Sequence, residues 1–185
     1  MRIVYRASQF WDALLAVPGE EQLAKAEKIL SSPLMELFQK MLPSEQAHSL
    51  SVFQRLTEQG ETSSDLLKAA LLHDVGKVRC PLYPWERAMV VLGQALFPES
   101  VKRWGQGEPS GWKRAFVVAE KHPHWGAEMA AQAGASQLTL DLIKYHQVNP
   151  YDANKRNYVP NLYRVDNLDT FKLLLTRLQT VDDNS

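Results

Sequence analysis

Residues 66–77 read LLKAALLHDVGK, an apolar stretch that ends in a histidine, an aspartate and a lysine. Its apolar residues and His73 recur at the spacing of one helix face, and Ser63 or Ser64 can cap the helix at its N-terminus. A carboxylate at the end of such a helix is costly to bury unless a partner or a metal ion compensates its charge. The pair His73 and Asp74 therefore marks a candidate site, although the pair taken alone is more typical of a helix-end Asp beside a hydrogen-bonded core His.

Helical spacing continues through most of the chain. No segment shows a clear alternating pattern of strands or a clear Asn-Gly hairpin turn. The sequence therefore predicts an all-α fold. The tail, residues 181–185, is expected to fray. Helices are expected at residues 7–15, 20–30, 33–41, 44–59, 65–77, 85–96, 112–120, 126–133 and 138–145, and a last helix begins near Pro160.

Composition and charge narrow the class of protein. The 185 residues and the 45% hydrophobic content suit one folded domain with a modest appendage. The 21 Lys and Arg residues equal the 21 Asp and Glu residues, so no net charge attracts nucleic acid or an anionic membrane. Cys80 is the only cysteine, which excludes an intramolecular disulfide and suits a reducing compartment. The chain shows neither a signal-peptide core nor a membrane-spanning apolar run, and we expect a soluble, cytoplasmic protein.

The string LLHDVGK has companions that follow in a recognisable order along the chain. With them, the sequence resembles the HD-domain superfamily of metal-dependent phosphohydrolases, which implies a helical bundle with a metal site in its core. In that family a first His on an upstream helix, the His-Asp pair and a late Asp bind metal. The matching positions are His48, His73, Asp74 and Asp166, the last within LYRVDNLDTF. Asp169, on the same expected helix face, is the rival ligand or a partner of Asp166.

Two further segments resemble those that complete a two-metal site in some members of the superfamily. They are HPHWGAEMA, beginning at His122, and IKYHQ, which contains His146. The resemblance implies that His122 and His146 bind a second ion and that Asp74 bridges the two ions. His124 is the alternative to His122 as ligand, and otherwise a substrate-facing or a solvated residue.

The resemblance also divides the chain. It implies an N-terminal helical extension packed on the core, residues 1–42, and an HD domain, residues 43–180. Residues 78–121 contain four prolines and no motif that matches a member of known substrate. We expect this segment to be an insertion that sets specificity.

Imidazole and carboxylate ligands suit one or two divalent transition-metal ions, Fe, Mn, Co, Ni or Zn, better than an all-oxygen magnesium site. Two such ions can hold a hydroxide nucleophile and the oxygens of a phosphate. Asp74 and Lys77 are the expected catalytic residues. Lys77 could also bind a substrate phosphate, and its alternative is a solvated lysine at a helix C-terminus.

The expected function is hydrolysis of a small, nucleotide-type phosphomonoester or phosphodiester. The hydrolases of dinucleoside polyphosphates in this superfamily carry a similar pattern of six ligands. Cleavage of cyclic dinucleotides is disfavoured, because VNPYDAN stands where that subfamily has Gly-Tyr-Pro. Two alternatives stay open: a di-iron oxygenase of the HD type and a non-catalytic module that binds a nucleotide. Nothing in the sequence specifies an oligomeric state.

Overall fold

The computed structural model describes residues 16–149, 151 and 165–183, with side chains of the last helix described from Leu168 onward. The described residues form helices and no strand, which confirms the predicted all-α fold. The helix expected at residues 7–15 lies outside them. The α-helices are α2 (Glu20–Glu27), α3 (Ser32–Gln39), α4 (Pro43–Glu58), α5 (Ser64–Leu72), α6 (Pro84–Leu96), α7 (Pro98–Trp104), α8 (Arg114–Gln132), α9 (Gln137–Tyr145) and α10 (Val165–Asp182), with 3-10 turns η1 (Val75–Arg79) and η2 (Gly111–Lys113).

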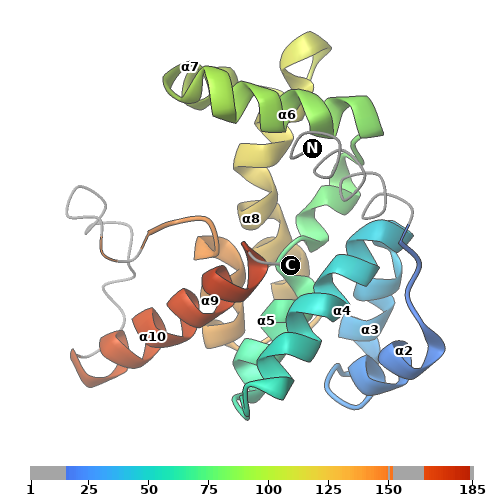
Figure 1. Cartoon of the computed structure of the whole chain (residues 1–185). Coiled ribbons are helices and arrows are strands. Elements are labelled where there is room, and N and C mark those ends of the chain that lie inside the picture. Colours follow the sequence, from blue (N-terminus) through green and yellow to red (C-terminus); the bar gives the residue numbers. More distant parts are fainter. Residues whose placement is uncertain (1–15, 150, 152–164, 184–185) are drawn as a thin grey trace, which may run out of the picture.

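Helix α5 lies at the centre of the main body, where α4, α9 and α10 pack against it (Figure 1). Its side chains Leu66, Leu71 and Leu72 are fully buried, as expected of a helix that is apolar on most of its circumference. Ala26 of α2 and Phe38 of α3 belong to the same core. The first two described helices are therefore part of the main body.

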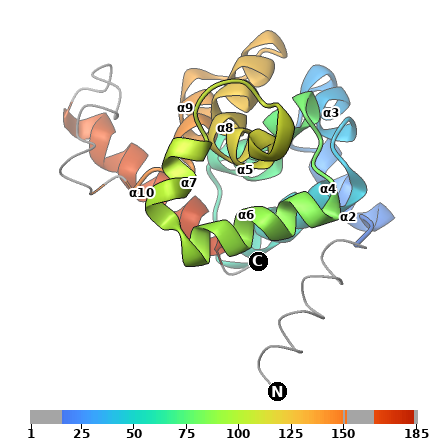
Figure 2. The ribbon, with the colours of Figure 1, turned by 90° about the horizontal axis from the view of Figure 1, so that it is seen from above.

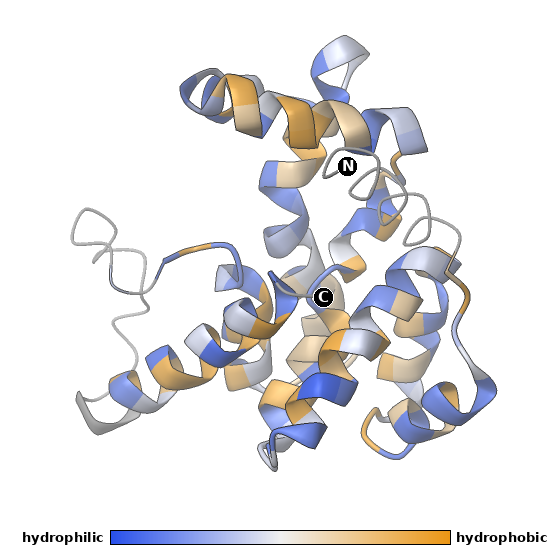
Figure 3. Ribbon diagram, viewed as in Figure 1, coloured by the Kyte–Doolittle hydropathy of each residue, from blue (hydrophilic) through white to orange (hydrophobic). Residues whose placement is uncertain are grey.

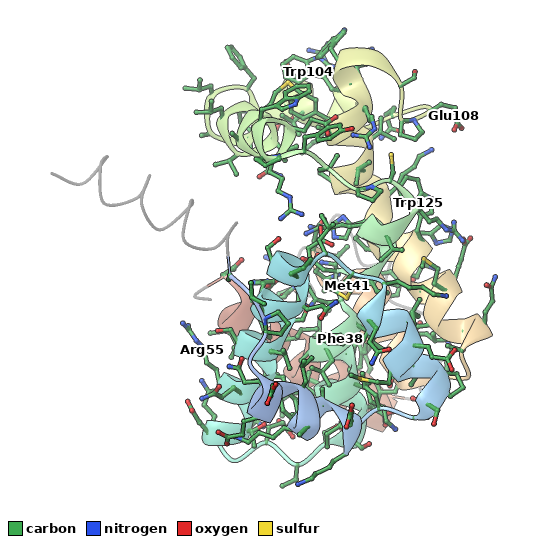
Figure 4. All side chains as sticks on the ribbon, turned by 90° about the vertical axis from the view of Figure 1, so that its right-hand side faces the viewer. Phe38, Met41, Arg55, Trp104, Glu108 and Trp125 are labelled. Carbon is green, nitrogen blue, oxygen red and sulfur yellow. The ribbon has the colours of Figure 1, made fainter. Side chains whose placement is uncertain are left out.

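A second, smaller core lies under α6 and α7. Val90 of α6 packs there with Leu82 and with Phe116 from the first half of α8. Figures 1 and 2 show α6 and α7 on one side of the molecule, joined to the main body by the long helix α8. In Figure 4 the labelled Trp104 lies in this lobe, whereas Phe38 and Met41 lie in the main body. We call α6, α7, η2 and the first half of α8 the upper lobe.

Three helical segments differ from the prediction. The two helices expected at residues 112–120 and 126–133 form the single helix α8, which continues through the buried Pro123. Residues 98–104 form α7, which was not predicted because the prolines of this region indicated breaks between elements. Helix α10 extends to Asp182, and Val181 is buried, so the chain is helical where its tail was expected to fray. No helix in the described part of the chain has the length and apolarity needed to cross a bilayer.

Candidate metal centre

Two helices of equal length deliver two of the histidines. Helices α5 and α9 each span nine residues and each ends with a histidine at its C-cap, His73 and His146. Their N-termini are joined, because Asp65 of α5 binds the hydroxyl groups of Ser136 and Thr139 at the start of α9. The rings of His73 and His146 consequently meet at the other end, with centroids 5.2 Å apart. Both helix C-termini point their negative dipole ends at this place, which favours a bound cation.

Three buried histidines share one hydrogen-bonding pattern. Each Nδ1 atom lies within hydrogen-bond distance of a backbone carbonyl in the preceding turn. A proton on Nδ1 leaves the Nε2 lone pair of a neutral imidazole facing inward, which is the usual arrangement of a metal-binding histidine. The distances are 2.9 Å from His73 to Ala70 O, 3.1 Å from His122 to Val118 O and 2.8 Å from His146 to Ile143 O.

Asp74 lies between two groups of potential ligands. Its ligand atoms and those of His48 and His73 all lie within 4.8 Å of one another, and the same holds for Asp74 with His122 and His146. One carboxylate oxygen of Asp74 is 3.2 Å from His122 Nε2, and the other is 3.7 Å from His73 Nε2. The structure therefore brings together five of the six predicted ligands around one buried carboxylate.

A sixth potential ligand at the cluster, and its second carboxylate, is Asp182 near the end of α10. Its Oδ1 atom is 2.8 Å from His48 Nε2 and 3.4 Å from His73 Nε2. Together with His48, His73 and Asp74, it forms a group of two imidazoles and two carboxylates. Gln179, one turn earlier on α10, donates hydrogen bonds to the carbonyls of His146 and Val148, at 2.8 and 2.9 Å. These bonds hold the end of α10 against the turn that carries His146.

Asp166 is not brought to this cluster. It is the second residue of α10, and its side chain lies outside the described residues. Sixteen residues of helix separate it from Asp182, a distance of about 24 Å at the rise of an α-helix. Asp169, the predicted rival, is exposed on the same distant half of α10. Among the described side chains, the carboxylate that α10 brings to the cluster is that of Asp182.

The electrostatics of the cluster call for a cation. Burial alone would lower the pKa of His73, but the charges of Asp74 and Asp182 outweigh it and raise the pKa to about 9. Burial together with the neighbouring imidazoles lowers the pKa of His146 to about 3, and burial also lowers that of His122. Burial would raise the pKa of Asp74, but the charges of Lys77 and His73 hold it well below its usual range.

Two contacts indicate what such a cation would satisfy. The buried Nε2 of His73 has no hydrogen-bond partner, although carboxylate oxygens lie nearby. The Nε2 atoms of His122 and His146 face each other at 3.4 Å, so without a proton or a metal ion between them two lone pairs would oppose one another. Imidazole nitrogens and carboxylates are also the donors that divalent transition metals prefer. The residues present therefore fit metal ions.

Lys77 and His124 have different surroundings. Lys77 Nζ lies 2.5 Å from Asp74 Oδ2 and is partly exposed, so its ammonium group is at the rim of the cluster. His124 is largely exposed and contacts Glu128, which also pairs with Arg79. The structure brings His122 to the cluster and leaves His124 on the surface.

A polar hollow of about 500 Å³ adjoins the cluster. His146 and Asp182 form part of its wall, so it gives access to the candidate ligands from the side of α9 and α10. Its other lining residues include Gln147, Asn149, Tyr151, Thr176, Thr180 and Asp183.

Two glycines bring the turn that carries Asp74 close to α8. A Cβ atom at Gly76 would lie 2.0 Å from the carbonyl oxygen of His122, and a Cβ at Gly126 would lie 3.1 Å from Gly76 N. Only glycine at position 76 lets η1 approach the backbone of α8 so closely. The glycines of the HDVG and HPHWG strings therefore set the distance between Asp74 and His122.

We expect Gly76→Ala to lower the free energy of unfolding by about 2 kcal/mol or more, because the added methyl group pushes η1 away from α8. Urea denaturation of the purified variant measures this change. Gly19→Ala is the control, since a Cβ there meets only the Gln22 side chain at 3.5 Å, and because Gly19 is the N-cap of α2 its effect should be about 1 kcal/mol or less. Equal stabilities of the two variants would contradict the close contact.

Comparison with known protein families adds an independent finding. The family model described as HD domain matches residues 46–171, which is more than half of the chain. The comparisons with curated proteins and with solved structures gave no match. The match covers all six predicted ligands, including Asp166, and it ends before Asp182. The chain therefore belongs to the HD-domain family, within the superfamily of metal-dependent phosphohydrolases.

Proposed function

We propose that this protein is a metal-dependent phosphohydrolase with a dinuclear centre and that it hydrolyses a nucleotide-type phosphoester. The observation that carries the proposal is the position of Asp74, whose carboxylate belongs to both groups of potential ligands. In the proposed site His48, His73 and Asp182 would hold one ion and His122 and His146 another, and Asp74 lies within reach of both groups. Ions so placed supply a water nucleophile at neutral pH and stabilise charge on phosphoryl oxygens.

The chain's own residues have distinct tasks in this proposal. The carbonyl contacts of the three Nδ1 atoms orient the imidazoles, so little rearrangement accompanies metal binding. Lys77 donates to Asp74 and offers its ammonium charge to a phosphoryl oxygen of the substrate. Burial of the cluster strengthens these interactions, because few water molecules screen them.

The polar hollow supports a nucleotide-type substrate. Among the described residues, its walls combine amide and hydroxyl groups with the carboxylates of Asp182 and Asp183. Sugar hydroxyls and a base can form hydrogen bonds with such groups. We therefore place the phosphoryl group at the metal ions, beside Lys77, and the uncharged part of the substrate in the hollow.

The assignment of Asp182 can be tested against Asp166 with matched substitutions. We expect Asp182→Asn to weaken metal binding at one of the two positions by about tenfold or more, because it removes a charged ligand. Asp166→Asn should bind metal as the wild type does. Elemental analysis of protein purified without chelator, followed by metal titration, measures both. Loss of metal in Asp166→Asn with full retention in Asp182→Asn would reverse the assignment.

Activity is tested with protein loaded with Mn or Co on a panel of nucleotide phosphomonoesters and phosphodiesters. We expect phosphate or nucleotide release by the wild type and a loss of more than about a hundredfold in Asp74→Ala, since the bridging ligand is gone. Glu99→Gln, on the exposed side of α7, is the control that should keep its activity. Retained activity in Asp74→Ala would contradict the proposal. So would iron-dependent consumption of O₂, or nucleotide binding without turnover.

The raised pKa of His73 predicts that metal binding releases a proton. At pH 7 the metal-free protein carries a proton on His73, because its pKa is about 9, and a metal ion requires the neutral ring. Apparent affinity should therefore rise about tenfold per pH unit between roughly pH 7 and 9 and level off above. Calorimetry in buffers of different ionisation enthalpy measures the proton count. A count of zero at pH 7 would rule out the protonated His73.

A further inference from the structure

Helix α6 carries only two charged residues, Glu86 and Arg87, and both form ion pairs. Beyond them the helix is largely hydrophobic (Figure 3). Arg87 reaches across to α4, where its Nη2 atom donates to Oε1 of Glu45 at 2.7 Å and its Nη1 atom donates to the hydroxyl group of Ser44 at 3.4 Å. Arg87 therefore connects the upper lobe with the helix that carries His48.

Glu45 lies beside the metal centre. It is three residues before His48, so the two side chains lie on the same side of α4, and His48 shares one group of potential ligands with Asp74. The side chain of Glu45 is only 4% exposed. Burial raises the pKa of Glu45, and the charges of Lys77 and Arg87 oppose this effect. This buried carboxylate therefore interacts with Lys77 as well as with Arg87.

Lys77 consequently has two carboxylates in its surroundings. Its ammonium group contacts Oδ2 of Asp74 at 2.5 Å, and the flexible stem of a lysine allows that group to move to another acceptor. Both oxygens of Glu45 are already occupied, because Arg87 binds Oε1 and the backbone N–H of Leu42 donates to Oε2 at 3.3 Å. With Glu45 occupied in this way, Lys77 stays with Asp74 at the rim of the cluster.

We propose that Arg87 is a positioning residue, which occupies Glu45 and thereby keeps the ammonium group of Lys77 beside Asp74. The inference rests on the proposed function, in which Lys77 binds a phosphoryl oxygen of the substrate. A buried carboxylate that loses its cation is strongly destabilised. Without Arg87, Glu45 draws Lys77 toward itself and away from the phosphate. The upper lobe thus acts on the metal centre through a residue that does not touch the substrate.

Binding of inorganic phosphate to the Mn-loaded protein tests the position of Lys77 without turnover. We expect calorimetry to show that Arg87→Met weakens phosphate binding about tenfold or more, because the charged contact of Lys77 is lost, while the metal content stays that of the wild type. Arg87→Lys should stay within about threefold of the wild type, since its charge still occupies Glu45. Arg103→Met removes an exposed arginine of α7 and is the matched control, which should bind phosphate normally.

Two double variants separate this positioning role from a purely structural one. In Glu45→Gln/Arg87→Met no second carboxylate attracts Lys77, so phosphate binding should return to within about threefold of the wild type. Lys77→Met/Arg87→Met should bind phosphate no more weakly than Lys77→Met, because Arg87 acts only through Lys77. Additive losses in this second double variant would overturn the proposal. Circular dichroism confirms that each variant is folded.

Glu45→Gln alone gives an outcome that does not depend on the folding of Arg87→Met. It should keep phosphate binding, and a loss of binding there would overturn the proposal. A metal-loaded wild type that binds no phosphate and hydrolyses no phosphoester would overturn both the proposed function and the role of Arg87. A wild type that does both, with an equally effective Arg87→Met variant, would overturn the role of Arg87 alone.

Discussion

The buried charge of Asp74 is the constraint on which the arrangement of the main body depends. An ionised carboxylate in a protein interior is stable only where cations or hydrogen-bond donors surround it. Three groups surround Asp74. Lys77 comes from the same turn, His73 directly precedes Asp74 in the chain, and His122 approaches Asp74 from α8. Gly76 and Gly126 are needed because the contact between Asp74 and His122 requires the backbones of η1 and α8 to lie close together. Removing one of these features leaves a buried charge without its partner.

The lengths of α5 and α9 also serve to bring candidate ligands to Asp74. Asp65 joins the starts of α5 and α9, and nine residues later each helix ends at a histidine, so the two imidazoles arrive at one level. The ends of these helices also direct negative dipoles to the cluster, which adds to the carboxylates in attracting cations. The main core, built around Leu66, Leu71 and Leu72, holds this end of the bundle rigid.

The sequence was informative where pattern and local chemistry agree. The all-α fold follows from helical spacing. The resemblance to the HD superfamily, carried by LLHDVGK, HPHWGAEMA and IKYHQ, pointed to five histidine and aspartate residues that the structure brings together. Two errors share a cause, which is that tertiary packing overrides local signals. Pro123 does not end α8, because that helix is buried against η1 and α9. Helix α10 continues through residues 181 and 182, because Phe171, Leu175 and Leu178 form a buried face whose next turn includes Asp182.

An ion pair joins the two lobes in addition to α8. Arg87 of α6 contacts Glu45 at 2.7 Å, and this carboxylate is buried one turn before His48 on α4. Burial raises the pKa of Glu45, although the charges of Lys77 and Arg87 act in the opposite direction. Because Glu86 holds the same end of α6 to Arg114 of α8, the N-terminus of α6 is fixed between the helices that carry His48 and His122. The inner side of α6 thus braces the helices that carry these candidate ligands.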